Sequence, residues 1–314
     1  MTILINLLLL LLLFIVLGWS ANFAVKNIKY IAAVLKIHLF TFGILLGLVT
    51  SLPELFLGVN ATIDQAAVLS VGNLLGGIIV ILGLILGVSL IFNRVVVTDG
   101  RLKSLIPAVL VIFSPILFGI DGKYALFDGL AMIGLYVGLI LYLYRLNRFS
   151  NNTHIRIANG NQAAKSMFFI IIGVIGILIA SHWIIGITLG LLEHIQVSQL
   201  VIGLVVFSIG TNLPEISIAV TSWYKKSPEL SLSHLLSSSF TNVLILGGLA
   251  LIHPIIFDVN LEFWVLALFL GITLVLFTYS YHSGKKMDRS EGRVLLAVYV
   301  LFMIISIYLG FLGK

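Results

Sequence analysis

Two short segments of the 314-residue chain share the pattern Thr-x-Leu-Pro-Glu and place an acid inside a long apolar run. The first extends from Thr50 to Glu54, and the second from Thr211 to Glu215. A proline inside a helix removes one backbone donor and leaves the carbonyl of the preceding turn without its partner. Hydroxyl, carbonyl and carboxylate oxygens then converge within about one turn, and such oxygens are the ligands that hard cations prefer. The repeated motif therefore predicts a cation site.

Glu54 and Glu215 are the two acids that lie well inside apolar runs. An ionised carboxylate at the centre of a bilayer costs about 2.5 kcal/mol or more. Two carboxylates are accommodated best when they face one another across a cavity and share a cation or protons. Their combined formal charge balances one Ca²⁺, two Na⁺ or two H⁺. The alternative, in which each is a protonated hydrogen-bond donor between helices, is disfavoured because both acids recur beside Pro and Thr.

The elements that must position these residues are membrane spans. Hydrophobic residues make up 60% of the chain and charged residues 10%, against roughly 45–50% and 25% in soluble proteins. These proportions exclude an ordinary water-soluble protein. We expect an all-α integral membrane fold with ten transmembrane helices, because the apolar runs are long and lack the alternation of a barrel. The expected spans are residues 3–19, 37–60, 66–93, 104–120, 125–144, 166–190, 197–223, 230–253, 261–281 and 293–312.

A polar break at residues 146–165 divides the chain into two halves, 1–145 and 166–314, with five expected spans each. An odd number of spans per half makes the second half enter the membrane from the opposite side. The halves also match at one constant offset, which pairs Ser70 with Ser231. We therefore expect two inverted-topology five-helix repeats, as in secondary transporters. Their related regions are about 40–90 and 200–250, and 146–165 is the linker between them.

The basic residues predict the orientation. Of the 18 Lys and Arg residues, all except Lys123 and Lys314 fall in one alternating set of loops. Cytoplasmic loops carry such an excess, so we expect a multi-pass protein of the cell membrane with a cytoplasmic linker and both termini outside the cytoplasm. The net charge of +6 then reports orientation, and we expect no nucleic-acid partner. The chain has no cysteine and no recognisable catalytic constellation, so we expect neither an enzyme nor a cofactor.

The segments TSLPE and GTNLPE resemble the two alpha-repeat signatures of the cation/calcium exchanger superfamily, typified by prokaryotic sodium/calcium exchangers. That family has a Gly-Asn-x-x-Gly-Ser-Asn-x-x-Asn pattern on the next helix. The first half reads GNLLGGIIVI, in which Gly77 replaces the serine and Ile81 the final asparagine. The second half reads SHLLSSSFTN, in which His234 replaces the first asparagine.

The resemblance implies a secondary active antiporter that works by alternating access. Glu54 and Glu215 would bind Ca²⁺ and Na⁺ in alternation, and the bilayer would be the only partner that a single copy needs. The resemblance further implies that Thr50 and Thr211 contribute oxygens, that Ser51, Asn212, Ser238 and Asn242 complete flanking Na⁺ sites, and that Gly47 and Ser208 supply backbone carbonyls.

Gly77 and Ile81 remove two side-chain oxygens from one half of this site. Two alternatives therefore stay open: exchange of another cation or H⁺/Ca²⁺ antiport with altered stoichiometry, and a membrane protein that binds cations without transporting them. The family's proton/calcium branch has a further glutamate on the second ligand helix, which this chain lacks. This difference favours Na⁺ over H⁺.

Overall fold

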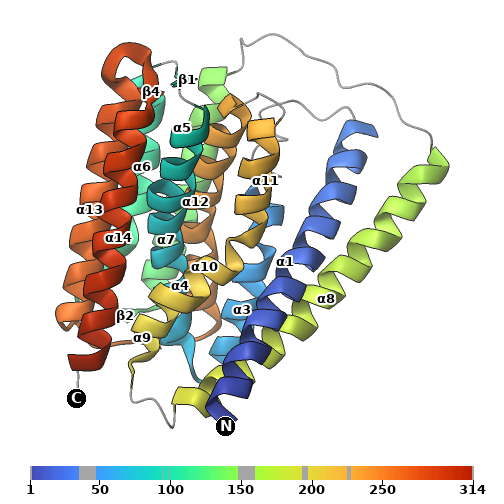
Figure 1. Cartoon of the computed structure of the whole chain (residues 1–314), viewed down its shortest axis with the longest axis vertical. Coiled ribbons are helices and arrows are strands. Elements are labelled where there is room, and N and C mark those ends of the chain that lie inside the picture. Colours follow the sequence, from blue (N-terminus) through green and yellow to red (C-terminus); the bar gives the residue numbers. More distant parts are fainter. Residues whose placement is uncertain are drawn as a thin grey trace.

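The computed structural model describes residues 2–34, 47–93, 95–98, 100–147, 160–192, 197–224 and 228–312, which form a bundle of tilted helices (Figure 1). The helical segments are α1 (Thr2–Val34), α3 (Leu52–Ile63), α4 (Ala67–Ile79), η1 (Val80–Ile85), α5 (Leu86–Asn93), α6 (Leu102–Phe118), α7 (Leu126–Asn147), α8 (Gly160–Leu192), α9 (Gln199–Ile202), η2 (Gly203–Phe207), α10 (Ser208–Thr211), α11 (Leu213–Tyr224), α12 (Pro228–Ile252), α13 (Leu261–His282), η3 (Ser283–Lys285) and α14 (Arg289–Leu312). The strands are β1 (Val95–Val97), β2 (Lys123–Tyr124), β3 (Ile255–Ile256) and β4 (Lys286–Asp288).

Several sequence-based predictions concern other parts of the chain. The first part of the expected span 37–60 and most of the expected linker 146–165 lie outside the described residues. The same holds for some of the loop residues that predict orientation, namely Lys36, Arg94, Arg148, Arg156, Lys225, Lys226 and Lys314.

Seven helical segments of the described chain are long and apolar enough to cross a membrane. They are Leu4–Asn27, Ala67–Asn93, Leu126–Leu146, Lys165–Leu192, Leu232–Ile252, Leu261–Lys285 and Arg289–Phe311. A further span is bent by 41° between Gln199–Thr211 and Leu213–Val220. Helices α3 and α6 are apolar but shorter, with 12 and 17 residues. The chain is therefore a multi-pass α-helical membrane protein.

Burial separates a central pair of spans from an outer set. The segment formed by α4, η1 and α5 is 83% buried and α12 is 72% buried, whereas α1 and α14 are each 28% buried. Exposed leucine, isoleucine and valine side chains cover the outer helices, as expected where lipid rather than water is the solvent. These two helical segments therefore form the interior of the bundle.

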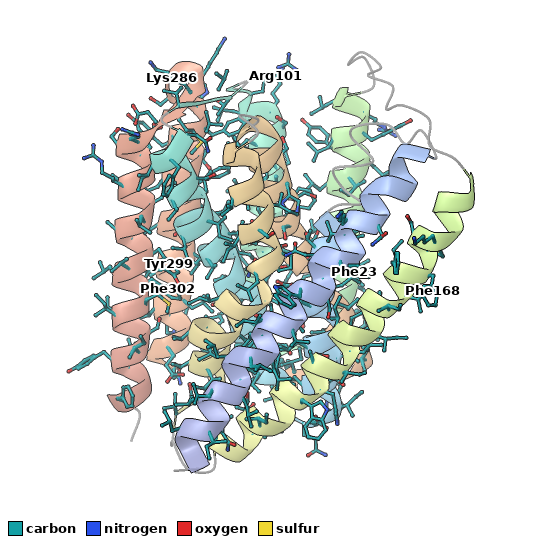
Figure 2. The ribbon with its side chains drawn as sticks, turned by 45° about the vertical axis from the view of Figure 1, so that its right-hand side comes forward. Phe23, Arg101, Phe168, Lys286, Tyr299 and Phe302 are labelled. Carbon is teal, nitrogen blue, oxygen red and sulfur yellow. The ribbon has the colours of Figure 1, made fainter. Side chains whose placement is uncertain are left out.

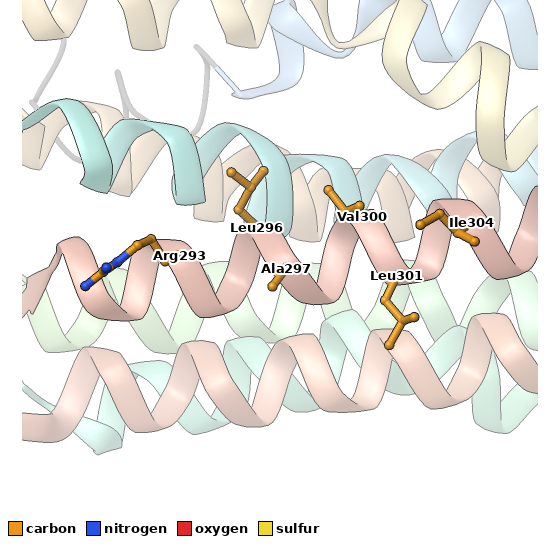
Figure 3. A pocket seen from close by; sticks show the side chains of 6 residues that line it. All are labelled: Arg293, Leu296, Ala297, Val300, Leu301 and Ile304. Atoms are coloured by element: carbon orange, nitrogen blue, oxygen red, sulfur yellow. The ribbon is translucent and has the colours of Figure 1, made fainter.

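Helix α14 illustrates a lipid-facing surface. A shallow apolar pocket follows one stripe of this helix (Figure 3), lined by Arg293, Leu296, Ala297, Val300, Leu301 and Ile304. These positions recur every three or four residues, so they share one helix face. The only charged group of the stripe, Arg293, is at the end that lies near β4. The stripe is apolar apart from Arg293, as expected for a surface that faces lipid.

Helix α1 is longer than the sequence predicts. The expected span ends at residue 19, whereas the helix continues to Val34. Residues 20–34 contain neither glycine nor proline, so nothing in that stretch breaks the helix, and the Asn27 side chain bonds the carbonyl of Phe23 within it. The boundary at residue 19 was wrong because Ser20 and Asn22 end the apolar run without ending the helix.

Helices α1 and α8 lie side by side at one edge of the bundle and cross it obliquely (Figures 1 and 2). Their backbones approach closely where Gly173 faces the carbonyl of Ser20, since a Cβ on this glycine would lie 2.8 Å from that oxygen. The rings of Phe23 and Phe169 meet edge to face at 5.2 Å. Small residues at such contacts are typical of helix pairs in membranes.

Capping residues explain why the outer helix α14 begins where it does. Asp288 accepts hydrogen bonds from the backbone N–H groups of Ser290 (2.8 Å) and Glu291 (3.3 Å). Glu291 in turn accepts from the backbone N–H of Asp288 (2.9 Å). This capping box starts α14 at Arg289, four residues before the expected start at 293. The Ser290 hydroxyl also donates a hydrogen bond to Asp288. This bond and the two backbone bonds lower the pKa of the Asp288 carboxyl.

Two short antiparallel sheets lie at opposite ends of the bundle (Figure 1). In one, β1 pairs with β4, and Val96 is opposite Met287. In the other, β2 pairs with β3, and Tyr124 is opposite Ile255. Each sheet joins a loop of the first half of the chain to a loop of the second half. The two halves are therefore tied together at both ends of the molecule.

Candidate cation site

The two Thr-x-Leu-Pro-Glu motifs form the same backbone structure. In each, a helix is interrupted at the residue before the leucine: Ser51 has φ −86° and ψ 12°, and Asn212 has φ −81° and ψ 12°. A new helix then begins, with proline in its first turn and glutamate directly after it. Proline cannot donate a backbone hydrogen bond, so it is tolerated at a helix start and disrupts an uninterrupted helix.

The two glutamates are buried in the middle of the bundle. The exposed fraction is 1% for Glu54 and 0% for Glu215, and each carboxylate is close enough to experience the charge of the other. The Thr211 hydroxyl lies beside Glu54, and the Thr50 hydroxyl lies beside Glu215. Each carboxylate thus borders the threonine of the opposite half. The sequence-based expectation that the acids face one another across a cavity stays a prediction.

Two serines extend the polar cluster on one side. Ser238 of α12 donates a hydrogen bond to Glu215 Oε1 (2.8 Å). The hydroxyl of Ser51 lies 3.2 Å from the hydroxyl of Ser238. All three side chains are buried, with exposed fractions of 1% or less. This contact brings the interrupted helix of the first half against the ligand helix of the second half.

Each motif threonine also has a partner from the other half that sequence reasoning did not assign to the site. The Thr211 hydroxyl donates to Asn73 Oδ1 (3.0 Å), and the Thr50 hydroxyl lies 3.1 Å from His234 Nε2. Asn73 is on α4 and His234 is on α12. The signal was present in the sequence, because the offset that relates the two motifs also relates Asn73 to His234.

The amides of Asn212 and Asn242 are held by backbone acceptors. Asn212 Nδ2 donates to the carbonyl of Ser208 (2.7 Å), and Asn242 Nδ2 donates to the carbonyl of Leu74 (3.0 Å). These bonds fix which end of each amide is nitrogen. The Oδ1 atoms of both asparagines are buried and receive no hydrogen bond from any described residue.

The same is true of one oxygen of each glutamate. Glu54 Oε2 and Glu215 Oε2 are buried and have no hydrogen-bond donor among the residues that the structure describes. Buried acceptors are nearly always satisfied in folded proteins. Together with the two asparagine oxygens, they form a set of four buried oxygens that lack a donor. A cation or protons would satisfy this set, and the chemistry of its members suits Na⁺ or Ca²⁺.

The two expected carbonyl ligands are engaged within their own helices. The Gly47 carbonyl accepts from the Thr50 hydroxyl and from the backbone N–H of Ser51, both at 3.1 Å. The Ser208 carbonyl accepts from Asn212, as described above, and the Ser208 hydroxyl donates to the carbonyl of Leu204. Both residues therefore border the cluster, but their carbonyl oxygens already have donors.

The two replacements in the first half discussed above, Gly77 and Ile81, differ in their surroundings. Ile81 is fully buried and belongs to the apolar core. Gly77 faces the polar cluster, because a Cβ at this position would lie 3.1 Å from Asn212 Nδ2 and 3.2 Å from Asn242 Nδ2. Position 77 thus adjoins the cluster without contributing an oxygen to it.

Comparisons with known proteins identify the family of the chain. The model of the family described as sodium/calcium exchanger protein matches residues 5–145 and 165–308. An uncharacterized membrane protein of Methanocaldococcus jannaschii is 25% identical over 293 residues, covering 91% of this chain and 93% of that protein. The sodium/calcium exchanger MaX1 of Methanosarcina acetivorans is 24% identical over 350 residues, covering 97% and 99%. The inner membrane protein YrbG of Escherichia coli is 27% identical over 218 residues, covering 65% and 66%.

The fold is similar to solved structures of the sodium-calcium exchanger NCX_Mj. For the protein soaked with 2.5 mM Na⁺ and 1 mM Sr²⁺, the TM-score is 0.68 at 23% identity, covering 94% of this chain and 96% of that chain. For the protein soaked with zero Na⁺ and Ca²⁺, the TM-score is 0.64 at 23% identity, covering 94% and 97%. This likeness concerns the fold.

Proposed function

Because the chain belongs to the sodium/calcium exchanger protein family, we propose that it is a secondary active antiporter that exchanges Na⁺ for Ca²⁺ at the site between Glu54 and Glu215. The gradient of one ion drives the movement of the other, so neither ATP nor a cofactor is required. No covalent step takes place. Both ions are substrates, and the bilayer is the only partner that the exchange cycle needs.

The observation that carries this proposal is the set of four buried oxygens without donors on Glu54, Glu215, Asn212 and Asn242. Two carboxylates balance the charge of one Ca²⁺ or two Na⁺. Binding of one ion species therefore excludes the other, and this competition is what an antiporter requires. The hydroxyls of Thr50, Thr211, Ser51 and Ser238 adjoin the same carboxylates and complete the ligand set.

Two features support an inverted repeat of two five-span halves, 1–145 and 166–314. First, the contacts of Thr50 and Thr211 correspond across the two halves. Second, adding 161 to the residue number carries Val95 of β1 onto Ile256 of β3, and Tyr124 of β2 onto Lys285, directly before β4. Related strands thus lie in the two sheets at opposite ends. In this proposal, α3 and α6 complete the set of ten spans, with the missing part of the α3 span outside the described residues.

The orientation follows from the same proposal. The start of α1 and the end of α14 lie at one end of the molecule, and Arg101 and Lys286 lie at the other (Figures 1 and 2). Because cytoplasmic ends carry the excess of basic residues, both termini are extracytoplasmic in the cell membrane.

Alternating access requires an element that moves across the site. Helices α1 and α8 are the candidates, because they form a pair at the edge of the bundle and both contact the motif helices. The pair covers the second motif through Phe14 of α1, whose ring lies against Gly210. On the other side, Asn60 of α3 donates a hydrogen bond to Ser181 of α8 (2.8 Å).

The first test is Na⁺-gradient-driven uptake of radioactive Ca²⁺ into proteoliposomes. In Glu54→Gln and Glu215→Gln, the remaining charge cannot balance Ca²⁺, and we expect at least about a tenfold loss of flux, since a single uncompensated charge in the membrane costs 2.5 kcal/mol or more. Asp64→Asn is the matched control, because Asp64 is an exposed acid at the end of the same helix as Glu54. Wild-type flux in both glutamine variants would contradict the site.

The second candidate function is exchange of another cation or of H⁺ for Ca²⁺. The observation that favours it is the glycine at position 77, where the polar cluster lacks a hydroxyl. Uptake that follows an imposed pH gradient and ignores Na⁺ would select this function. Ca²⁺ binding with no flux under any gradient would instead select a cation-binding protein that does not transport.

A further inference from the structure

The polar cluster has two corners that share two pairs of positions related by the 161-residue offset but differ in chemistry. The serine corner consists of Ser51, Ser238 and Glu215. The amide corner consists of Gly77, Asn212 and Asn242. The offset relates Ser51 to Asn212, since 51 + 161 = 212, and Gly77 to Ser238, since 77 + 161 = 238. At each of these two pairs of positions, the serine corner has a hydroxyl that the amide corner lacks.

The serine corner presents oxygen atoms. Ser238 lies 2.8 Å from Glu215 Oε1 and 3.2 Å from the hydroxyl of Ser51. A hydroxyl can rotate its proton away and turn a lone pair toward a cation. Two hydroxyls beside a carboxylate can therefore coordinate a monovalent cation at a small free-energy cost.

The amide corner presents nitrogen atoms. A Cβ at position 77 would lie 3.1 Å from Asn212 Nδ2 and 3.2 Å from Asn242 Nδ2, so both amide NH₂ groups border the space beside Gly77. An amide nitrogen is a donor without acceptor capacity, and its partial positive charge repels a cation. Because Gly77 has no side chain, no hydroxyl oxygen offsets this repulsion.

The two amides cannot turn their oxygens into this corner without losing hydrogen bonds. Asn212 Nδ2 is bound to the Ser208 carbonyl at 2.7 Å and Asn242 Nδ2 to the Leu74 carbonyl at 3.0 Å. A flip would place an amide oxygen against each of these buried carbonyls. Leaving a buried acceptor against another acceptor is costly, so the nitrogen-lined surface is fixed by the backbone.

We propose that the amide corner excludes a cation while the serine corner admits one, so that this site binds one monovalent cation fewer than a site with two serine corners. The inference rests on the proposed function and specifies its stoichiometry. Gly77 and Asn212 are then the residues that determine how many monovalent ions are exchanged for each Ca²⁺.

The test compares how steeply Na⁺ displaces bound Ca²⁺ in the purified full-length protein. By linkage, the slope of the logarithm of the apparent Ca²⁺ Kd against the logarithm of the Na⁺ concentration follows the number of Na⁺ ions that replace each Ca²⁺. The double variant Gly77→Ser/Asn212→Ser places a hydroxyl at both offset-related positions of the amide corner and keeps the Asn242 amide on the Leu74 carbonyl. The shorter residue at 212 removes the nitrogen that would lie 3.1 Å from the new Cβ. We expect the slope to rise by about one in this variant.

The reverse exchange keeps the proposal falsifiable if that variant does not fold. Ser51→Asn/Ser238→Gly removes both hydroxyls from the serine corner and places an amide there, and we expect the slope to fall by about one. An unchanged slope in either folded variant, with Ca²⁺ still bound and displaced by Na⁺, would overturn the inference and leave the proposed function intact. A wild-type protein that binds Ca²⁺ but does not release it to Na⁺ would overturn the proposed function first.

Discussion

At the scale of single residues, the site is assembled by contacts that cross between the two halves of the chain. Thr50 contacts His234 and borders Glu215, and Thr211 contacts Asn73 and borders Glu54. No half could therefore form the site on its own. The hydroxyls of the motif are oriented by the opposite half, so the geometry of the ligands depends on how the halves pack.

Asn73 tests this dependence. Asn73→Ala removes the Asn73 Oδ1 acceptor without removing a predicted ligand, so that the Thr211 hydroxyl turns to its other acceptor, the carbonyl of Phe207 (3.1 Å). We expect the apparent Ca²⁺ affinity to fall about fivefold, as for the loss of one hydrogen bond of about 1 kcal/mol. The measurement is the Ca²⁺ dependence of initial flux. Asn93→Ala is the control, because the Asn93 amide bonds only the carbonyl of Ser89 in its own helix; equal affinities in the two variants would count against the positioning role.

The sequence predicts which residues of the motifs carry oxygen, and it predicts less about where those oxygens point. The repeated Thr, Pro and Glu identify the two interrupted helices, because proline and a buried acid are each rare inside an apolar span. The direction of the Asn242 amide could not be predicted, because the carbonyl that holds it belongs to Leu74 on a distant segment. For the same reason, the sequence indicates only that a ligand is missing at Gly77.

At the scale of elements, composition predicts where apolar segments lie and fails at their ends. A helix can continue through polar residues such as Lys26, so α1 extends beyond its expected range. The π-helical segments η1 and η2 also have no sequence signal of their own. Each lies on a span that contributes to the site, and η2 precedes the second motif directly. Such segments are frequent at functional sites.

The contact between α1 and the second motif makes a prediction at this scale. A Cβ on Gly210 would overlap the ring of Phe14, which also meets Phe207 edge to face at 5.8 Å. Overpacking at such contacts costs about 1–3 kcal/mol, and in Gly210→Ala this strain displaces α1. We expect flux to fall about tenfold or more. Adding Phe14→Ala removes the overlap and should restore part of the flux.

Gly186→Ala on α8 is the matched control for this substitution, because a Cβ there would meet nothing within 4 Å. Its flux should equal that of the wild type. If Gly210→Ala transports normally, or if Phe14→Ala does not relieve its defect, then the position of α1 over the second motif does not limit exchange.

At the scale of the whole molecule, the scarce charges and the two small sheets define its ends. The sheet of β1 and β4 lies at the end that carries Arg101 and Lys286, and the sheet of β2 and β3 lies at the other (Figures 1 and 2). The distribution of basic residues predicts these ends from sequence, because it depends on loop composition alone. The strands could not be predicted, since each has only two or three residues and pairs with a distant loop.

The absence of cysteine from the chain allows a direct test of orientation. Lys123→Cys and Lys286→Cys introduce single thiols at exposed positions of β2 and β4, on opposite ends of the molecule. A maleimide that does not cross membranes should label Lys123→Cys in intact cells and should label Lys286→Cys only after the cells are opened. Labelling of both thiols from outside would contradict the placement of these strands on opposite faces of the membrane. The reversed pattern would keep the inverted architecture and place both termini in the cytoplasm, because the termini lie at the β2 end of the bundle.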